Sequence, residues 1–198
     1  MEIERSTTAL LVMDLQHDIV STEGKFGSQG AGQAVADAGT VESCARALGI
    51  ARAAGLVVIH VGVEVRDGQA LNVSAQLFAA VSELGALQAG SAGAEFAPPV
   101  APRAGELVVM KAAVSAFAGT DLDAHLRNRG IRNLVLCGFA TNFVVEGTAR
   151  QAVDLGFAVT ILADGCSSFD PTWHEVGLQV LAMLTNQATI DEFAAALA

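Results

Sequence analysis

Five short apolar runs, separated by segments with helical patterning, constrain the fold more than any other feature of the sequence. Each is a nearly continuous apolar stretch, rather than one that alternates with polar residues, and each is too short for a buried helix. Strands of this kind that alternate with helices are typical of a parallel sheet covered on both faces. The sequence therefore predicts an α/β fold, a three-layer Rossmann-like sandwich with a mostly parallel sheet of about six strands. The runs are TALLVM (8–13), LVVIHV (56–61), ELVVMK (106–111), NLVLC (133–137) and AVTILA (158–163).

The segments between these runs carry helix signals. Residues 34–55 have apolar positions at helical spacing and stop at Gly55, and residues 70–87 contain a short helix. Thr120 or Asp121 begins a capped amphipathic helix, and Asp170 followed by Pro171 begins another. Residues 142–155 are also predicted to be helical, and residues 188–190 form a short sixth strand before a terminal helix.

The length of the chain predicts the number of domains, and its net charge limits the kinds of binding partner. The chain has 198 residues, which predicts one domain over residues 1–198. Its net charge of −10, with no compensating basic cluster, argues against nucleic acid or an anionic membrane as a partner and leaves a small-molecule substrate.

The cysteines and the amino-terminal sequence indicate the cellular compartment in which the protein is found. Cys44, Cys137 and Cys166 are odd in number and have no CxxC spacing, as in reduced proteins without a disulfide framework. Acidic residues precede the first apolar run, which is too short for a signal or membrane helix. We therefore expect a cytoplasmic protein.

Two charged residues come directly at the ends of predicted strands. Ligands of open parallel sheets bind beyond the carboxyl ends of the strands, where Asp14 and Lys111 both fall. Each residue alone is as compatible with an ordinary turn or a solvated strand end. Together they place an acid and a base at one edge of the sheet, where each charge can tune the other for proton transfer.

Other chemical signals in the sequence are weak. The glycines of residues 27–39 lack dinucleotide-binding spacing, and GxSxG, Walker A and HExxH motifs are absent from the sequence. His17 and His60 are candidates to approach Asp14, but no close pair of histidines suggests a metal site. We expect neither a metal nor a cofactor. Cys44 and Cys137 are predicted to be core residues, and Cys166 is an inert cysteine near the functional edge.

The order of these segments resembles the isochorismatase-like hydrolases, a superfamily that includes nicotinamidases, N-carbamoylsarcosine amidohydrolases and isochorismatases. Four stretches carry the resemblance: ALLVMDLQHDIV (9–20), GSAGAEFAPPVAP (90–102), residues 108–170 from VVMK to SSFD, and HEVGLQVL (174–181). The resemblance implies catalytic roles for Asp14 and Lys111. It also implies that family members of this kind form homodimers or homotetramers.

The same resemblance assigns the turn at residues 138–141, which reads GFAT, to the family's G-x-x-T turn. It implies a cis peptide bond between Phe139 and Ala140. It also implies substrate or oxyanion binding by the turn and the residues that follow it, which are Phe139, Ala140, Thr141 and Phe143. The cysteine hydrolases carry their nucleophile three residues after the threonine, and that position is Val144 in this chain. Valine cannot form the covalent intermediate.

Three hypotheses follow from the substitution at Val144. The first is a hydrolase that acts on a vinyl ether or an amide-like substrate without a thiol, using Asp14 for proton transfer, Lys111 for electrostatic support and backbone N–H groups at Ala140 and Val144. The second is a catalytically silent family member that binds a ligand or serves as a scaffold. The third makes Cys166 a replacement nucleophile from a neighbouring loop.

Overall fold

The computed structural model describes residues 3–66, 71 and 73–198, and the predicted α/β sandwich is confirmed. Six strands form one sheet in the order β3-β2-β1-β4-β5-β6, and all of its strand pairs are parallel. The strands are β1 (Thr8–Met13), β2 (Val57–Val63), β3 (Leu107–Lys111), β4 (Asn133–Phe139), β5 (Ala158–Ser167) and β6 (Asn186–Ala188).

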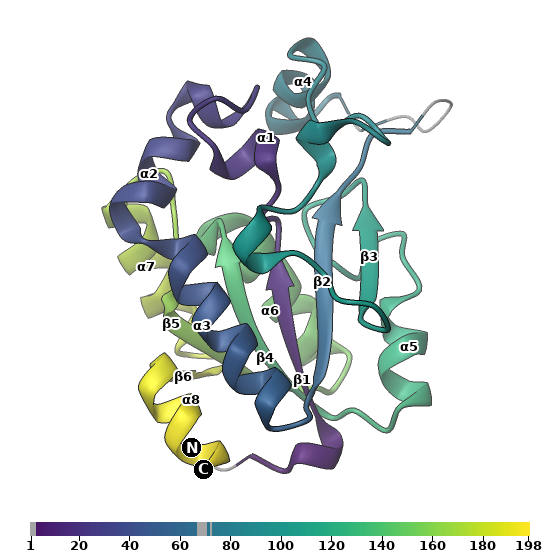
Figure 1. Ribbon diagram of the computed structural model, residues 1–198, viewed down its shortest axis with the longest axis vertical. Coiled ribbons are helices and arrows are strands. Elements are labelled where there is room, and N and C mark those ends of the chain that lie inside the picture. The colour runs from purple at the N-terminus through teal and green to yellow at the C-terminus, as the bar shows by residue number, and fades with distance from the viewer. Residues whose placement is uncertain (1–2, 67–70, 72) are drawn as a thin grey trace.

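Helices cover both faces of this sheet (Figure 1). In the view drawn, α3 and α8 lie in front of the sheet and α6 lies behind it. The helices are α1 (His17–Val20), α2 (Ala31–Ala38), α3 (Thr40–Ala53), α4 (Gln76–Glu83), α5 (Leu122–Asn128), α6 (Glu146–Asp154), α7 (Pro171–Leu181) and α8 (Ile190–Leu197). Among the described residues, none of these helices has the length and apolarity needed to cross a bilayer.

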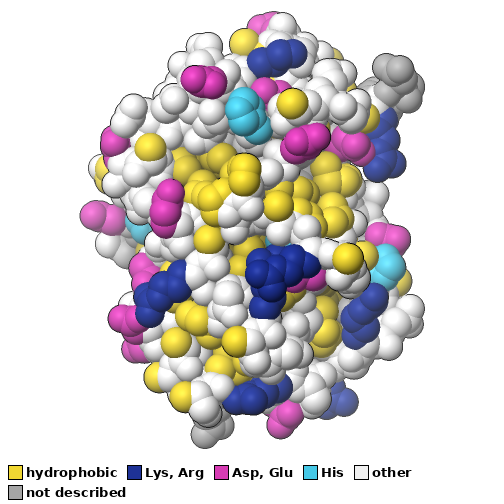
Figure 2. All heavy atoms as spheres, in the orientation of Figure 1, with side chains coloured by type: hydrophobic (Ala, Val, Ile, Leu, Met, Phe, Trp, Pro, Cys, Tyr) yellow, Lys and Arg dark blue, Asp and Glu magenta, His cyan; other side chains and the backbone are white. Residues whose placement is uncertain are grey.

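The central strands are continuous apolar runs because both of their faces are covered. Every residue of β1 is buried, as are all but the first residues of β2 and β4. At roughly 25 cal/mol per Å² of apolar surface removed from water, this burial is the main force that holds the layers together. On the face drawn in Figure 2, acidic and basic side chains are interspersed around a central apolar area.

Several boundaries differ from the sequence predictions. The helix predicted through residues 34–55 is two helices, because Gly39 takes the left-handed conformation (φ 62°) between α2 and α3. The helix predicted from residue 142 begins instead with a π-helical turn, η5 (Thr141–Val145), before α6. Strand β5 extends to Ser167, and β6 ends at Ala188 because Thr189 caps α8 in a capping box.

Glycine is required where β4 approaches β1 at the carboxyl edge of the sheet. Gly138 pairs with Met13, has a φ of 136°, and a Cβ atom there would lie 2.2 Å from the Met13 carbonyl oxygen. Only glycine allows both this conformation and this approach. The close contact places the turn after β4 beside the residue that follows β1, which is Asp14.

Candidate active site

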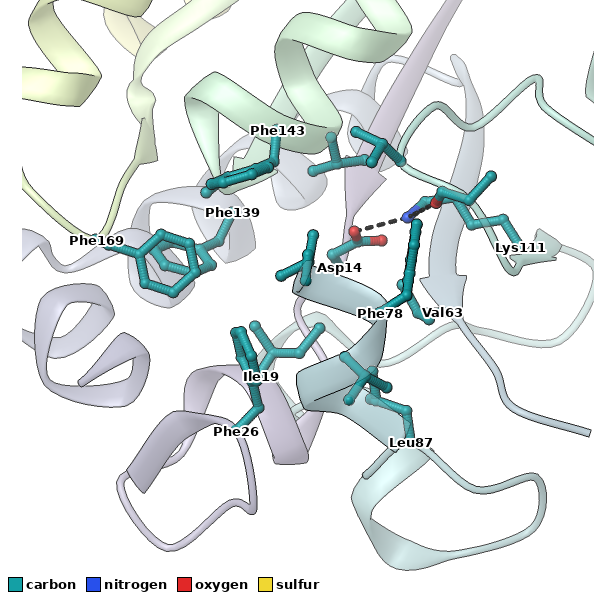
Figure 3. A pocket seen from close by; sticks show the side chains of 16 residues that line it. Asp14, Ile19, Phe26, Val63, Phe78, Leu87, Lys111, Phe139, Phe143 and Phe169 are labelled. Atoms are coloured by element: carbon teal, nitrogen blue, oxygen red, sulfur yellow. Dashed lines mark hydrogen bonds and ion pairs between the residues drawn. The ribbon is translucent and has the colours of Figure 1, made fainter. Parts of the chain in front are cut away.

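Asp14 and Lys111 meet at the carboxyl edge of the sheet, although the edge strand β3 and β1 are separated by β2. The Lys111 Nζ donates a hydrogen bond of 2.8 Å to Asp14 Oδ2 and another of 3.0 Å to the Ala113 carbonyl oxygen. Both residues are buried, with exposed fractions of 7% for Asp14 and 2% for Lys111. Figure 3 shows this pair projecting into a pocket.

The two carboxylate oxygens of Asp14 differ in their surroundings. Oδ2 accepts the lysine hydrogen bond, whereas Oδ1 is buried without a hydrogen-bond partner among the described residues. Burial raises the pKa of Asp14, and the charge of Lys111 offsets part of that rise. An unpartnered carboxylate oxygen in a cavity, on a group whose pKa is displaced upward, has the properties of a general acid or base.

The backbone at Asp14 is unusual. Asp14 has a φ of 57°, a left-handed conformation that is uncommon for residues other than glycine. Its N–H donates to the Val61 carbonyl oxygen at 2.8 Å, so the chain stays attached to β2 as it turns. Backbone strain of this kind persists where the surrounding structure enforces it, and such positions cluster at functional sites.

The turn after β4 forms the opposite wall of the pocket. The peptide bond between Phe139 and Ala140 is cis, as the resemblance implied. Phe139, Ala140, Phe143 and Val144 all line the cavity together with Asp14 and Lys111. Val144, at 2% exposure, presents only hydrocarbon to this cavity.

Thr141 lies outside this lining. Its side chain is fully buried behind the turn, where Oγ1 donates to the Ser167 carbonyl oxygen at 3.0 Å and lies 2.7 Å from Nδ1 of His174. Because the hydroxyl hydrogen is used by Ser167, Nδ1 of His174 acts as the donor in this arrangement. Thr141 therefore joins the turn to β5 and α7.

The other residues singled out from the sequence lie elsewhere. The His60 ring contacts Glu106, with Nε2 and Oε2 2.9 Å apart, and the side chain of His17 is exposed. Cys166 is buried beside a different groove, between α2, α7 and the end of β5. Burial raises the pKa of the Cys166 thiol well above its ordinary value, which disfavours the thiolate a nucleophile needs.

Two buried polar residues near the site were missed from the sequence. The Gln16 side chain donates to the carbonyl oxygens of Val63 and Ala94 and accepts from the Val63 N–H, all within 2.8 Å. Asp18 accepts from the N–H groups of Leu87 and Lys25. Their signal was the alternation of polar residues in DLQHD directly after a buried strand. Both residues hold loops that form the rim of the cavity.

The described residues contain no group of three or more histidine, cysteine, aspartate or glutamate side chains that could hold a metal ion. The last two residues of the stretch HVGVEVRDG (60–68) lie outside the described part of the chain. The polar chemistry of the described cavity is supplied by Asp14, Lys111 and the backbone.

Comparison with known proteins agrees with this geometry. Residues 8–192 match the Isochorismatase domain family model. The chain is 35% identical over 176 residues to the uncharacterized isochorismatase family protein YecD of Escherichia coli O157:H7, covering 88% of this chain and 87% of the relative. It is 30% identical over 190 residues to the ureidoacrylate amidohydrolase RutB of Variovorax paradoxus (strain S110), covering 89% and 72%.

A solved structure shows the same architecture. A cysteine hydrolase from Pseudomonas syringae pv. phaseolicola 1448A superposes with a TM-score of 0.89 at 26% sequence identity, and the match covers 100% of this chain and 95% of that one. The similarity therefore extends through the whole sheet and the edge that carries Asp14 and Lys111.

Proposed function

Because the chain belongs to the isochorismatase family, whose members act as hydrolases on small molecules, we propose that it hydrolyses its substrate without a covalent intermediate at position 144. The observation that carries this proposal is the buried, unpartnered Oδ1 of Asp14, a residue that lines the cavity together with Val144, where the resemblance to the family implies a nucleophile. Water is then the attacking group, and Asp14 is the residue that moves its proton.

The amide reaction fits the residues present. Asp14 Oδ1 takes a proton from water as the water oxygen attacks the substrate carbonyl carbon, and it returns the proton to the leaving nitrogen as the C–N bond breaks. Lys111 holds the carboxylate by its other oxygen and stabilises its ionised form. In this proposal the backbone N–H groups at Ala140 and Val144, which are residues of the cavity lining, receive the carbonyl oxygen.

The amide class is favoured over a vinyl ether by the relative named as a ureidoacrylate amidohydrolase. A vinyl ether would need Asp14 in its protonated form, to deliver a proton to carbon before water adds. The two reactions differ in pH dependence. Activity rises with pH through the pKa of Asp14 when the residue is a base, and it falls when the residue is an acid.

The direct test is Asp14→Asn, measured for kcat/KM on a panel of small amides, ureides and vinyl ethers. Loss of the proton carrier reduces turnover by roughly 10²- to 10⁴-fold. The double variant Asp14→Asn with Lys111→Met, which removes both charges of the pair, serves as the folding control in thermal unfolding. Full activity of a folded Asp14→Asn protein would refute the proposal.

The absence of a covalent step is tested separately by intact-protein mass spectrometry with p-nitrophenyl acetate. The wild-type chain acquires no acetyl group, whereas Val144→Cys, with a thiol beside the same turn, provides the positive control. Acetylation of the wild-type chain at Cys166 during turnover would contradict the proposal and support the replacement-nucleophile hypothesis.

Catalytic silence is the second candidate, and the observation that favours it is the hydrocarbon side chain of Val144 at the nucleophile position. It predicts ligand binding by calorimetry with no Asp14-dependent turnover on any member of the same panel.

A further inference from the structure

The cavity beside Asp14 is surrounded by phenylalanine. Five phenylalanines from five different segments line it, and we refer to them as the phenylalanine cage: Phe26, Phe78, Phe139, Phe143 and Phe169. Phe169 makes edge-to-face contacts with three of the others, at ring-centroid distances of 4.9 to 5.9 Å. These contacts fix the rings before a ligand arrives. Figure 3 shows the rings and several aliphatic side chains around Asp14.

The charges in this lining cancel. Asp14 and Lys111 are the ionisable side chains among the lining residues, and they pair with each other at 2.8 Å. Two of the three Nζ hydrogens of Lys111 are already donated, to Asp14 and to the Ala113 carbonyl oxygen. The described lining therefore offers a substrate carboxylate no unpaired cation, and burying an unpaired carboxylate is strongly unfavourable.

The cavity is also small. Its internal space is about 60 Å³. A space of this size favours a small substrate group next to the reacting carbonyl over a long chain.

From this lining we propose that the substrate is an uncharged small molecule whose apolar ring or branched alkyl group fills the phenylalanine cage, with its neutral carbonyl group at Asp14. The inference rests on the proposed function, which it makes more specific. The proposed substrate differs in charge from that of the relative named for ureidoacrylate, because ureidoacrylate carries a carboxylate. Neutral amides with a hydrocarbon group are the class that this cavity recognises.

The test is calorimetric binding of a matched pair, benzamide and benzoate, which differ in charge but little in shape. The cage predicts that benzamide binds at least about 10-fold more tightly than benzoate. Phe143→Ala weakens benzamide binding by about 10-fold or more, consistent with the loss of a buried aromatic contact. The control is Phe117→Ala, which removes a phenylalanine that stacks on Phe157 outside the cavity and leaves the affinity within about twofold.

Equal or tighter binding of benzoate would overturn the inference, as would absence of binding by both compounds at millimolar concentration. Neither result bears on the proposed function, because Asp14-dependent turnover of charged members of the substrate panel would still be measured. Conversely, preferential binding of benzamide with no turnover of any panel member leaves the cage intact and refutes the hydrolase mechanism.

A separate observation carries a second inference, on the outer face of α7. Five of the eight large apolar side chains that are most exposed among the described residues lie on this helix and the turn after it. They follow a helical spacing and define an apolar stripe: Trp173 (53% exposed), Val176 (51%), Val180 (38%), Met183 (85%) and Leu184 (45%). An exposed apolar stripe of this length is typical of an interaction surface.

We infer that the apolar stripe binds a second copy of this chain. Residues 171–185 contain one acidic residue, Glu175, and no lysine or arginine, in a chain of net charge −10. Two such chains repel each other over most of their surfaces, so a nearly uncharged face is where they can meet. The stripe exposes on the order of 500 Å² of apolar surface, a large part of the ~800 Å² that each partner buries in a stable interface. Two stripes packed about a two-fold axis form a self-complementary contact.

Sedimentation velocity tests this inference. The wild-type chain sediments as a dimer or larger even-numbered assembly, and Val176→Glu converts it to monomer at tens of micromolar. The control is Val108→Glu, which places the same charge at a 40%-exposed valine on β3 and leaves the assembly unchanged. A monomeric wild-type chain, or an assembly that Val176→Glu does not alter, would overturn it.

Discussion

The molecule holds two carboxylates beside cations, the buried Asp14 and the partly buried Glu106, and their surroundings are opposite. Glu106 accepts two hydrogen bonds of 2.8 Å from Arg52 and one of 2.7 Å from the Arg103 N–H, and its Oε2 lies 2.9 Å from the His60 ring. Asp14 accepts a side-chain hydrogen bond from Lys111 and leaves Oδ1 without a partner among the described residues.

Their pKa values differ in the same way. The hydrogen bonds from Arg52 hold the pKa of Glu106 at about 2, well below its ordinary value of 4.5. Burial raises the pKa of Asp14. A carboxylate whose lone pairs are all satisfied stabilises the fold and has no capacity left for a substrate. A carboxylate that faces a cavity with a free oxygen destabilises the fold and can exchange a proton.

The largest stability effect is expected at the satisfied carboxylate. Glu106→Gln leaves Arg52 without its ion pair and lowers the free energy of unfolding by about 2 kcal/mol, less than for a fully buried pair because both side chains are partly exposed. Urea unfolding monitored by circular dichroism measures this change. Turnover per folded molecule stays within about twofold, because the cluster does not line the cavity. A loss of activity larger than the loss of folded protein would break the distinction between the two carboxylates.

The second prediction concerns the pH dependence of stability. The folded-state pKa of Glu106 lies below its unfolded value, so its contribution is fully present above pH 4.5 and is lost as the pH falls from 4.5 towards about 2. The difference in unfolding free energy between wild type and Glu106→Gln therefore shrinks by up to about 2 kcal/mol over this range, once the pKa shift is discounted for solvent screening. Titrations of both proteins at several pH values test this, and a difference that stays constant with pH would contradict it.

These two carboxylates also show what sequence can and cannot predict. Asp14 and Lys111 were found because each follows an apolar strand, and parallel topology brings such ends to one edge of the sheet. Glu106 precedes a strand and was read only as its first residue. Its partners Arg52 and His60 come from α3 and β2, and no local sequence pattern predicts a contact between residues so far apart in the chain.

The lining of the cavity was also hard to predict, because it is formed by segments that are distant in the sequence. The first residues of the first five strands were predicted to within one residue, because continuous apolar runs are a local signal, whereas β5 extends four residues beyond its predicted end. The phenylalanine cage was not predicted beyond Phe139 and Phe143, since Phe26, Phe78 and Phe169 reach it from loops and from α4. Tertiary packing, which depends on how those segments fold over the edge, decides which side chains line a site.

The third prediction separates the roles of the two residues in the active pair. Lys111→Met removes the charge that lowers the pKa of Asp14, so the acidic limb of the kcat/KM profile moves to higher pH. At pH 7 the rate falls by roughly 10-fold, less than for Asp14→Asn, because the proton carrier is still present. A pH–rate profile over pH 4–9 checks both effects. If the acidic limb of the kcat/KM profile does not shift, that limb does not reflect the ionisation of Asp14.

The smallest effect is expected at the position where the family pattern has its nucleophile. Val144→Ala deletes two methyl groups from a buried side chain and lowers the free energy of unfolding by about 1–2 kcal/mol. Because Val144 offers no reactive group, kcat/KM changes by only a few-fold. Urea unfolding and steady-state kinetics on the same preparation measure the two quantities. A loss of activity as large as that of Asp14→Asn would assign a chemical role to this side chain.

The most direct test of the account compares Asp14→Asn and Glu106→Gln in one experiment, with kcat/KM and the free energy of unfolding measured on the same samples at pH 7. The two variants are expected to lose different properties. Asp14→Asn loses roughly 10²- to 10⁴-fold in activity per folded molecule, in addition to the stability that is lost when the Lys111 charge stays buried without its ion-pair partner. Glu106→Gln loses about 2 kcal/mol of stability and keeps its activity. Both variants losing activity in proportion to stability, or Asp14→Asn remaining fully active, would contradict it.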